Sequence, residues 1–484
     1  MKPIPAMYCL ISYVIPALRP AQDRPGFARA GIRFDFSSVQ KTKVKMDPSV
    51  TRATHSPFGP ASPFARCARS RWDDTGVILS FTRFLLSPLR RMSALLVLGL
   101  LPASALAADA AFDRCLTTLR GSAAKHAITT VTWDRYTTGL APDPSVLEAL
   151  DAQPEFVTPI WDYLAALVDE ERVAEGQRRL REHATTLGKV TAQYGVDVET
   201  VVAVWGVESD YGRVFGKRPL LTSLATLSCA GRRQDYFRTE FFATLKILQS
   251  GDVSVEALRG SWAGAFGHTQ FMPSTFLRIA VDFDGDGRRD LIGNADDSLA
   301  STANYLAKAG WRRGERWGFE ARLPARFDAK RAGRRSKQPL AHWAALGVRR
   351  IDGSALVGAD APAQRAAAVI IPSGHQGPAF VVFRNYDAIF AYNAAESYSL
   401  AIALLSDRLR GGKGLIARWP TDDPGLSRIE RRELQTLLSA RGHPIGEIDG
   451  LIGKASREAI QREQRRLGQT VDGRAGRRLL EALR

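Results

Sequence analysis

Apolar residues recur at helical spacing over most of residues 108–320, and this pattern predicts a largely helical body. Residues 171–194 carry apolar positions with charges between them and end before a glycine, so we expect one helix there. Another helix should begin after Asp197, a residue type that caps helix N-termini. A further helix should cover residues 237–248, because a glycine follows shortly afterwards.

The pattern changes between residues 320 and 390. Residues 369–372 and 380–383 are short β-type runs, with glycine and proline between them. Runs of this kind predict strands, which would form a small sheet inserted into the helical body. Helical spacing returns over residues 394–409. The expected fold class is therefore α+β, mainly α.

The last sixty residues contain an internal repeat. The segment 449–460 recurs as 472–483, a period of 23 residues, and each copy opens with Asp-Gly. An Asp-Gly pair permits a turn with positive φ, and each turn is followed by a helical pattern. Together with a helix over residues 427–440, the repeat predicts a three-helix module at 426–484. The glycines and prolines of residues 413–425 predict a linker before it.

The pattern of the first 107 residues is that of a targeting segment rather than of a folded domain. Residues 1–91 have no sustained period, and two arginines precede a short apolar run at 92–101. Ala105-Leu106-Ala107 has the form of a signal-peptide cleavage site, so residues 92–107 predict a signal peptide. An internal signal peptide is unusual: either the natural start lies further downstream, or residues 1–91 form a long disordered extension.

Export is the localisation that this signal predicts, with the periplasm as the compartment. The chain contains no run of 18 apolar residues free of charge, so we expect no transmembrane helix. No cysteine directly follows the apolar run, so no lipid anchor is expected. A catalytic or binding body would then occupy residues 108–412.

The net charge of +17 is unevenly distributed. Residues 1–91 hold 15 Lys and Arg against 5 Asp and Glu, and residues 426–484 hold 13 against 8, whereas residues 92–425 hold 39 against 37. A nucleic-acid-binding protein should carry its basic face on the main folded domain, so nucleic acid is not an expected partner. A basic terminal module suits an anionic polymer such as the cell wall.

Two of the four cysteines, Cys115 and Cys229, would remain after signal cleavage. An even pair in an oxidising compartment predicts one disulfide, and two buried thiols are the alternative. No Cys/His cluster with zinc spacing is present.

Residues 201–212 combine an apolar helical face with one acidic residue. Val201, Trp205 and Glu208 are spaced four and three apart, so Glu208 falls on the apolar face one turn after Trp205. A carboxyl group removed from water keeps its proton to higher pH, as a general acid must. From the pattern alone, a structural glutamate capped by the turn at Ser209 is the favoured interpretation.

Further motifs change that interpretation. W-G-V-E-S-D-Y-G at 205–212 is followed by A-T-L with R-R at 225–233, by S-x-A-G-A-x-G-x-x-Q-F-M-P-S at 261–274 and by S-x-A-N-Y at 301–305. In this order, over about residues 110–410, the motifs resemble those of the membrane-bound lytic transglycosylase B family, glycoside hydrolase family 103. The D-G-x-x-G repeat of residues 426–484 resembles the peptidoglycan-binding domain type 1 family.

The resemblance implies a lysozyme-like catalytic domain and roles for individual residues. Glu208 is the implied acid/base. The residues implied to line the substrate cleft are Ser261, Gln270, Phe271, Tyr305, Tyr392, Asn393 and Tyr398. Arg232 and Arg233 are implied to face carboxylates of the substrate, because guanidinium groups suit carboxylates. Core packing is the alternative for the aromatic residues. His268 lies within the third motif and receives no role.

Residues 282–290 form the front of an EF-hand-type loop, with Asp at positions 1, 3, 5 and 9 and Gly at position 6. Position 12 is a glycine, so the late carboxylate must come from Asp296 or Asp297, and the spacing leaves both open. The expected ligands of a structural Ca²⁺ are Asp282, Asp284, Asp286, Arg288 and Asp297. A solvated acidic turn is the alternative, and no organic cofactor is expected.

The resemblance implies that a monomeric enzyme cleaves the MurNAc–GlcNAc bond of peptidoglycan glycan strands and leaves 1,6-anhydroMurNAc ends. Glycosidases of the retaining or inverting kind need two carboxylates. Near Glu208 the sequence offers Asp210, which at an offset of two residues points to a different side of the helix. We therefore expect a mechanism with one carboxylate. The alternatives are a hydrolytic muramidase and a non-catalytic wall-binding protein.

Overall fold

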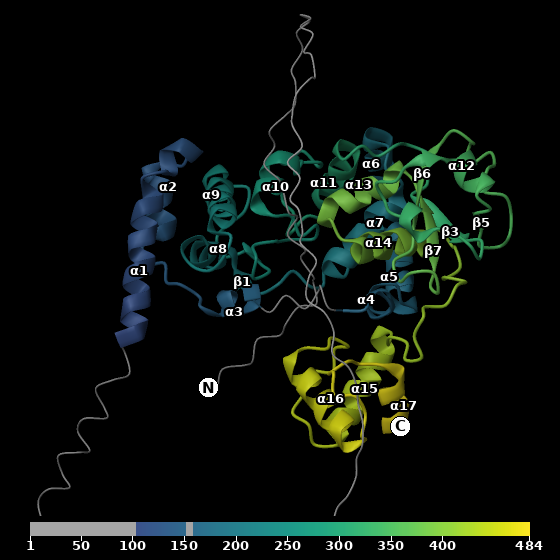
Figure 1. Ribbon diagram of the computed structural model, residues 1–484. Coiled ribbons are helices and arrows are strands. Elements are labelled where there is room, and N and C mark those ends of the chain that lie inside the picture. Colours follow the sequence, from purple (N-terminus) through teal and green to yellow (C-terminus); the bar gives the residue numbers. More distant parts are fainter. Residues whose placement is uncertain (1–102, 152–157) are drawn as a thin grey trace, which may run out of the picture. The chain divides into compact units, whose positions relative to one another are not determined.

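The computed structural model describes residues 103–151 and 158–484 (Figure 1). The predicted extension at 1–91 and most of the predicted signal peptide at 92–107 lie outside the described residues. The first described helix, α1 (Ala103–Arg120), begins inside the predicted signal segment. Within the described part of the chain, no helix is both long enough and apolar enough to cross a bilayer.

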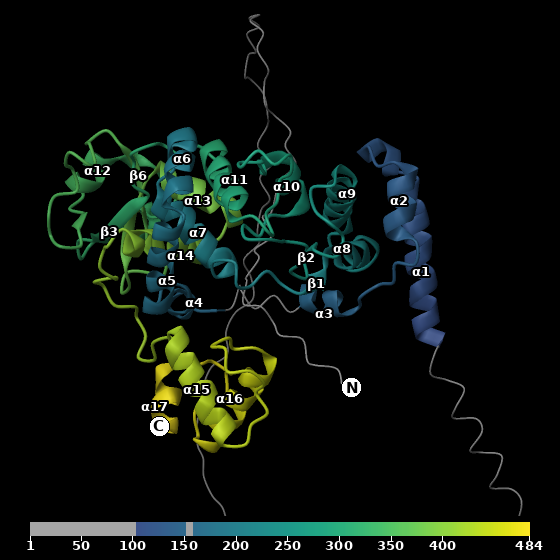
Figure 2. The same cartoon turned by 180° about the vertical axis from the view of Figure 1, so that it is seen from behind.

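The main core surrounds one helix, α7. Ten of its twelve residues are buried, and α5, α6, α11 and α14 pack against it (Figures 1 and 2). A helix that is apolar on all sides needs neighbours on all sides, and this requirement explains its central position. The helices of this group are α4 (Ile160–Leu167), α5 (Glu170–Glu182), α6 (Ala184–Tyr194), α7 (Val198–Ser209), α11 (Ala295–Lys308), α13 (Arg384–Asn393) and α14 (Glu396–Leu409).

The sequence prediction for this group is right about α7 and wrong about one boundary. Asp197 is the N-cap of α7, as predicted. The single helix expected over residues 171–194 is interrupted at His183, which ends α5 and precedes α6. The His183 ring lies 3.3 Å from a carboxylate oxygen of Asp296, at the start of α11. A contact between distant segments therefore coincides with a break that no glycine or proline marks.

A second hydrophobic core lies among helices that precede and follow α7 in the chain. α9 ends at Gly251 with positive φ, as the sequence predicts. The helices of this group are α1, α2 (Thr130–Thr137), α3 (Ser145–Asp151), α8 (Leu220–Cys229), α9 (Gln234–Ser250) and α10 (Pro273–Ile279), with a short 3₁₀ turn η2 (Ala123–His126). A two-stranded pair, β1 (Arg218–Pro219) and β2 (Arg259–Gly260), lies beside α8.

The inserted sheet is present, between α11 and α13 in the chain. Its strand order is β4-β6-β7-β3-β5, and all pairings are antiparallel. Side chains alternate along β6 and β7: Ile370 and Phe380 join the main core, whereas Val369 and Val381 join a separate core with Trp343. The elements are β3 (Gly318–Arg322), η4 (Ala329–Arg331), β4 (Gln338–Pro339), α12 (Leu340–Ala345), β5 (Arg349–Arg350), β6 (Ala366–Ile370) and β7 (Ala379–Val382).

The C-terminal repeat folds as two equivalent turn-and-helix units after α15 (Arg428–Ala440). These units lead into α16 (Lys454–Arg466) and α17 (Arg477–Leu483). In the first turn, the N–H of Gly450 donates to the buried Gln435 side chain at 2.7 Å. In the second turn, the N–H of Gly473 donates to Gln464 at 2.9 Å. Both glycines have positive φ, so the backbone favours glycine at the same point of each unit.

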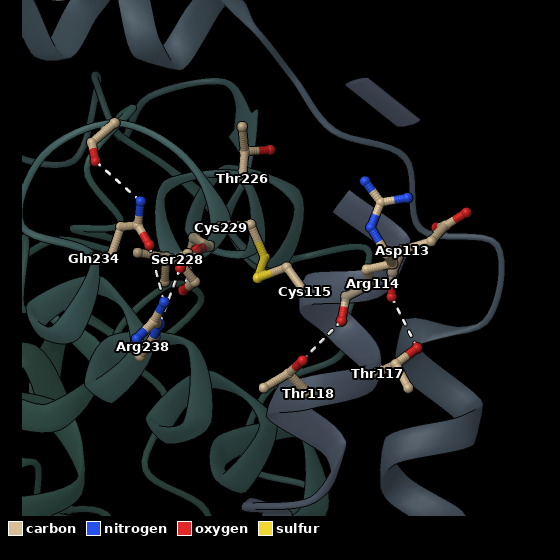
Figure 3. The surroundings of a disulfide bond; sticks show 12 residues. Asp113, Arg114, Cys115, Thr117, Thr118, Thr226, Ser228, Cys229, Gln234 and Arg238 are labelled. Carbon is tan, nitrogen blue, oxygen red and sulfur yellow. Dashed lines mark hydrogen bonds between the residues drawn. A yellow bond between two sulfur atoms is a disulfide. The ribbon is translucent and has the colours of Figure 1, made fainter. Parts of the chain in front are cut away.

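Cys115 of α1 and Cys229 of α8 form a disulfide across 114 residues of chain (Figure 3). Their Cα atoms are 5.7 Å apart, within the normal range for a disulfide. The bond ties the first described helix to the helix that carries the A-T-L motif.

Replacing Cys115 and Cys229 by alanine should lower the free energy of unfolding by about 2–5 kcal/mol, because the unfolded chain regains the freedom of a long loop. Urea unfolding of the oxidised parent and the double variant measures this difference. Reduced parent protein is the control and should match the variant. Equal stability of oxidised parent and variant would contradict a stabilising bond.

Candidate active site

Glu208 lies in the last turn of α7 and is only 2% exposed. The chain leaves the helix abruptly after it, because Asp210 and Tyr211 both have positive φ. Tyr211 folds back so that its O–H donates to the carbonyl of Arg172 at 2.8 Å. Gly206 makes this possible, since a Cβ there would lie 2.6 Å from the Tyr211 ring. The W-G-V-E-S-D-Y-G motif is therefore a buried helix end with a sharp exit.

Tyr398 provides a direct partner for the Glu208 carboxyl group. Its O–H donates to Oε1 of Glu208. The two residues are 190 positions apart in the chain and meet because α14 packs along α7. The sequence placed both residues at one site, and the structure brings them into contact.

Three further aromatic residues from the predicted set extend this pair. The ring of Tyr392 lies 6.2 Å from that of Tyr398 and 4.6 Å from that of Tyr305. Phe271 lies 5.9 Å from Tyr305 and 5.8 Å from Tyr392. The four rings therefore form a contiguous aromatic cluster, which begins at the Glu208 carboxyl group.

Backbone carbonyls fix two of these phenols. The O–H of Tyr392 donates to Thr269 at 2.8 Å, and that of Tyr305 donates to Ala391 at 2.6 Å. Burial raises the pKa of both phenols, and the negative charge of Glu208 raises each further. Both therefore remain neutral hydroxyl groups near neutral pH.

The other predicted residues of this site are held by the backbone. Gln270 is buried with positive φ, and its side-chain amide donates to the carbonyls of Gly267 at 2.7 Å and Phe215 at 3.2 Å. Its Oε1 is buried without a hydrogen-bond partner among the described residues. Ser261 accepts the N–H of Ala265 at 3.0 Å.

Three predicted residues remain: Asn393, Arg232 and Arg233. Asn393 is buried at the end of α13, next to Tyr392. Arg232 donates to the carbonyl of Leu150, and the Arg233 guanidinium lies over the ring of Tyr236. Both arginines are exposed in the turn between α8 and α9. Their contact with substrate stays a prediction.

Asp210, the other carboxylate of the motif, is in a different environment from Glu208. Its carboxylate lies 3.2 Å from the buried Arg172, 3.0 Å from Arg213 and 2.7 Å from Arg428 of the C-terminal module. Although burial alone raises the pKa of Asp210, the positive charges of Arg172 and Arg428 lower it overall. Asp210 is thus an ionised carboxylate committed to arginines. The sequence predicted that it would face away from Glu208 but missed this arginine network, because only the fold brings residues 172 and 428 together.

The acidic loop has the geometry that its sequence predicts at the front. Asp282, Asp284 and Asp286 are exposed, and each offers a carboxylate oxygen within 4.8 Å of the others. Side-chain oxygens of these aspartates accept loop N–H groups; for example, Gly285 donates to Asp282 at 2.7 Å. The N–H of Arg288 donates to Asp286 at 2.8 Å.

The two late aspartates have different contacts. Asp297 is fully buried and accepts the N–H groups of Phe283 at 2.7 Å and Asp290 at 2.8 Å, so its carboxylate faces the loop. Asp296 instead accepts the O–H of Thr186 in α6 at 2.7 Å. These oxygen donors are the kind that Ca²⁺ prefers, so the loop fits the ion.

Asp210→Asn should lower the free energy of unfolding by about 3–5 kcal/mol at neutral pH, because it leaves buried arginine charge without its partner. The folded pKa of Asp210 is lowered, so its contribution is complete above the unfolded value of about 3.9 and is lost as pH falls through the folded value. Urea unfolding at pH 7 and pH 3 should show the difference at pH 7 shrinking at pH 3. Asp235→Asn is the matched control, because the Asp235 side chain is 97% exposed. An equal effect of the two substitutions at pH 7 would contradict this role.

Two family models match the chain. The transglycosylase SLT domain matches residues 111–407, and the putative peptidoglycan binding domain matches residues 427–483. Among curated proteins, the chain is 34% identical over 203 residues to membrane-bound lytic murein transglycosylase B of Escherichia coli K12. That match covers 39% of this chain and spans 56% of the length of the relative.

Solved structures resemble the chain over longer stretches. SltB3 from Pseudomonas aeruginosa, solved in complex with NAG-anhNAM-pentapeptide, is 46% identical, with a TM-score of 0.62, over 77% of this chain and 99% of that one. SltB1 from P. aeruginosa is 27% identical, with a TM-score of 0.54, over 62% of this chain and 100% of that one. The E. coli lytic transglycosylase Slt35, solved in complex with calcium, is 27% identical, with a TM-score of 0.53, over 62% of this chain and 93% of that one. The chain accordingly belongs to the transglycosylase SLT domain family, with a C-terminal peptidoglycan-binding domain.

Proposed function

We propose that this chain is a lytic transglycosylase, which cleaves the β-1,4 bond between MurNAc and GlcNAc in peptidoglycan and leaves 1,6-anhydroMurNAc ends. One observation carries the proposal. The two carboxyl groups of the motif at 205–212 have different known partners: Glu208 is buried against a tyrosine, whereas Asp210 is bound by arginines. One carboxyl group is therefore left to perform the chemistry.

The mechanism begins with proton donation by Glu208 to the glycosidic oxygen. Tyr398 donates a hydrogen bond to Glu208, so it stabilises the carboxylate that remains after the proton has left. The acetamido group of MurNAc stabilises the positive charge that develops at the anomeric carbon. Glu208 then removes the proton from the C6 hydroxyl of the same sugar, and this oxygen attacks the anomeric carbon. The attack is intramolecular, so proximity favours it over attack by water.

The residues around Glu208 support this chemistry in two ways: some are placed to contact the sugars, and the two tyrosines Tyr305 and Tyr392 stay uncharged. Within the aromatic cluster, Tyr305 and Tyr392 are only partly buried, and their rings are proposed to stack on sugars. The buried Oε1 of Gln270 is available to accept an acetamido N–H. Because Tyr305 and Tyr392 stay protonated, Glu208 is the acid and base of the site.

Two other functions are compatible with parts of the chain. A hydrolytic muramidase would use water and would need a second carboxylate near Glu208. A non-catalytic wall-binding protein would leave the Glu208–Tyr398 pair without use. A zymogram on murein separates the binding protein from the two enzymes.

The C-terminal module is proposed to bind peptidoglycan, and its family match and Asp-Gly repeat support this. We place the catalytic domain at residues 108–412, the linker at 413–425 and the module at 426–484. The linker is tethered to the catalytic domain, since Glu320 accepts the N–H groups of Ile416 at 2.9 Å and Ala417 at 2.7 Å. Action on peptidoglycan and the segment at 92–107 together favour export to the periplasm, where we propose that the chain acts as a monomer.

A limit digest of purified sacculi tests the reaction. We expect MurNAc ends about 18 Da lighter than hydrolysed ones, because no water is added. Mass spectrometry of the muropeptides measures this. Digestion by a hydrolytic muramidase in parallel provides the heavier reference. Predominantly reducing MurNAc ends would refute the lytic mechanism.

Glu208→Gln should lower kcat by at least about 10²–10⁴-fold, because the amide cannot exchange a proton in this role. The fold should persist, since the two side chains have nearly the same shape. Turbidity loss of sacculi measures the rate, and circular dichroism checks the fold. Glu256→Gln is the control, because Glu256 is exposed on a loop. A variant within about threefold of the parent would remove Glu208 from the mechanism.

We propose that the loop at 282–297 holds a structural Ca²⁺ through Asp282, Asp284, Asp286, the carbonyl of Arg288 and Asp297. When bound, the ion neutralises carboxylates that otherwise repel one another. Calcium should raise the melting temperature relative to chelator, with a gain in free energy of unfolding of about 2.7 kcal/mol at a hundredfold excess over Kd.

Differential scanning calorimetry measures the calcium response. Asp284→Asn should reduce the rise in melting temperature caused by calcium. Asp235→Asn is the control and should leave this rise unchanged, because Asp235 lies outside the loop in sequence and is exposed. Identical melting in chelator and in millimolar calcium would count against the site.

A further inference from the structure

His268 contacts the catalytic helix on both sides of Glu208. The indole N–H of Trp205, three residues before Glu208, donates to Nδ1 of His268 at 2.9 Å. The O–H of Ser209, one residue after Glu208, donates to the carbonyl of His268 at 2.8 Å. His268, which lies outside α7, is therefore hydrogen-bonded to residues on both sides of Glu208.

The other contacts of His268 lead to the segment that follows the acidic loop. Its backbone N–H donates to the carbonyl of Leu291 at 2.8 Å. The backbone of Ile292 acts on the ring as well and raises the pKa of His268. Because Nδ1 accepts from the indole, the ring proton resides on Nε2, which is the nitrogen able to donate. His268 therefore connects α7, through its ring, to residue 291, through its backbone.

Burial lowers the pKa of His268 to about 4. Among nearby charged groups, Asp290 raises the pKa, whereas Arg179 and His183 lower it. The ring is consequently neutral at neutral pH, and its Nδ1 lone pair is free to accept the Trp205 proton. A protonated ring would present a second N–H to the indole N–H and would lose the bond.

The surroundings leave room for an imidazole. Gly212 lies against the ring, and a Cβ there would be 2.4 Å from a ring carbon of His268. Phe215 contacts the ring edge to face, with centroids 4.7 Å apart. Trp205 does the same at 5.4 Å. The ring orientation that points Nδ1 at Trp205 is thus fixed by packing on several sides.

We propose that His268 is a positioning residue for the reaction: its Nδ1 acceptor and its carbonyl fix the turn of α7 that presents Glu208. The inference rests on the proposed function, and it assigns to His268 no proton transfer and no contact with the reacting atoms. Displacement of a catalytic group by about 1 Å can cost about 10²-fold in rate, so the orientation of this turn matters.

Two substitutions separate positioning from packing. His268→Asn places an amide oxygen where Nδ1 lies and can still accept the Trp205 N–H. His268→Leu fills similar space without an acceptor. We expect the leucine variant to lower kcat about 10–100-fold with KM within about threefold, and the asparagine variant to retain kcat within about fivefold. His375→Leu, at an exposed loop position, is the control and should match the parent.

A spectroscopic measurement accompanies the kinetics. The Trp205 indole N–H resonance, assigned from its loss in Trp205→Phe, should shift in His268→Leu and stay near its parent position in His268→Asn. Parent kcat in the leucine variant would overturn the proposal. Equal losses of kcat in both variants, with an unmoved indole resonance, would do so too.

The outcomes also separate this inference from the proposed function. If His268→Leu is fully active while Glu208→Gln is inactive, the positioning role fails and the transglycosylase stands. If the parent itself leaves reducing ends, the proposed function fails, and the indole resonance still reports whether His268 orients Trp205.

Discussion

The structure depends on one constraint: the Glu208 carboxyl group must be kept almost free of water at the end of a buried helix. Glu208 is 2% exposed at the end of a helix that is buried on all sides, and a phenol is its direct partner. A buried carboxyl group needs hydrogen-bond partners, and the O–H of Tyr398 supplies one. The helices around α7, the abrupt turn at Asp210 and the aromatic cluster can all be understood as the means to maintain this environment.

The same motif shows how environment assigns different tasks to similar groups. Asp210 is two residues from Glu208, yet its carboxylate faces arginines of α5 and of the C-terminal module. Charge pairing keeps Asp210 ionised at neutral pH, where it joins two parts of the fold, whereas the role proposed for Glu208 is to exchange a proton. The lytic reaction needs only one such group, because the substrate supplies its own nucleophile.

Periodicity and turn residues predicted several helices, the inserted sheet and the repeat, because each of these is determined by residues close together in the chain. Asp197 and Gly251 marked helix ends that the structure contains. The break at His183 was not predictable in this way, since no local residue type signals it. The roles of Arg172 and His268 were missed for the same reason: their partners lie 30 or more residues away. Motif resemblance placed Glu208, Tyr398 and the other rings at one site, and it also included Arg232 and Arg233, whose contact with substrate stays a prediction.

The central claim is that the C6 hydroxyl of the sugar, and not water, attacks the anomeric carbon. Digestion of sacculi in water enriched in ¹⁸O, followed by mass spectrometry of the released muropeptides, tests this directly. The account predicts anhydro ends that carry no ¹⁸O. MurNAc ends labelled with ¹⁸O at the anomeric carbon would mean that water is the nucleophile and would contradict it.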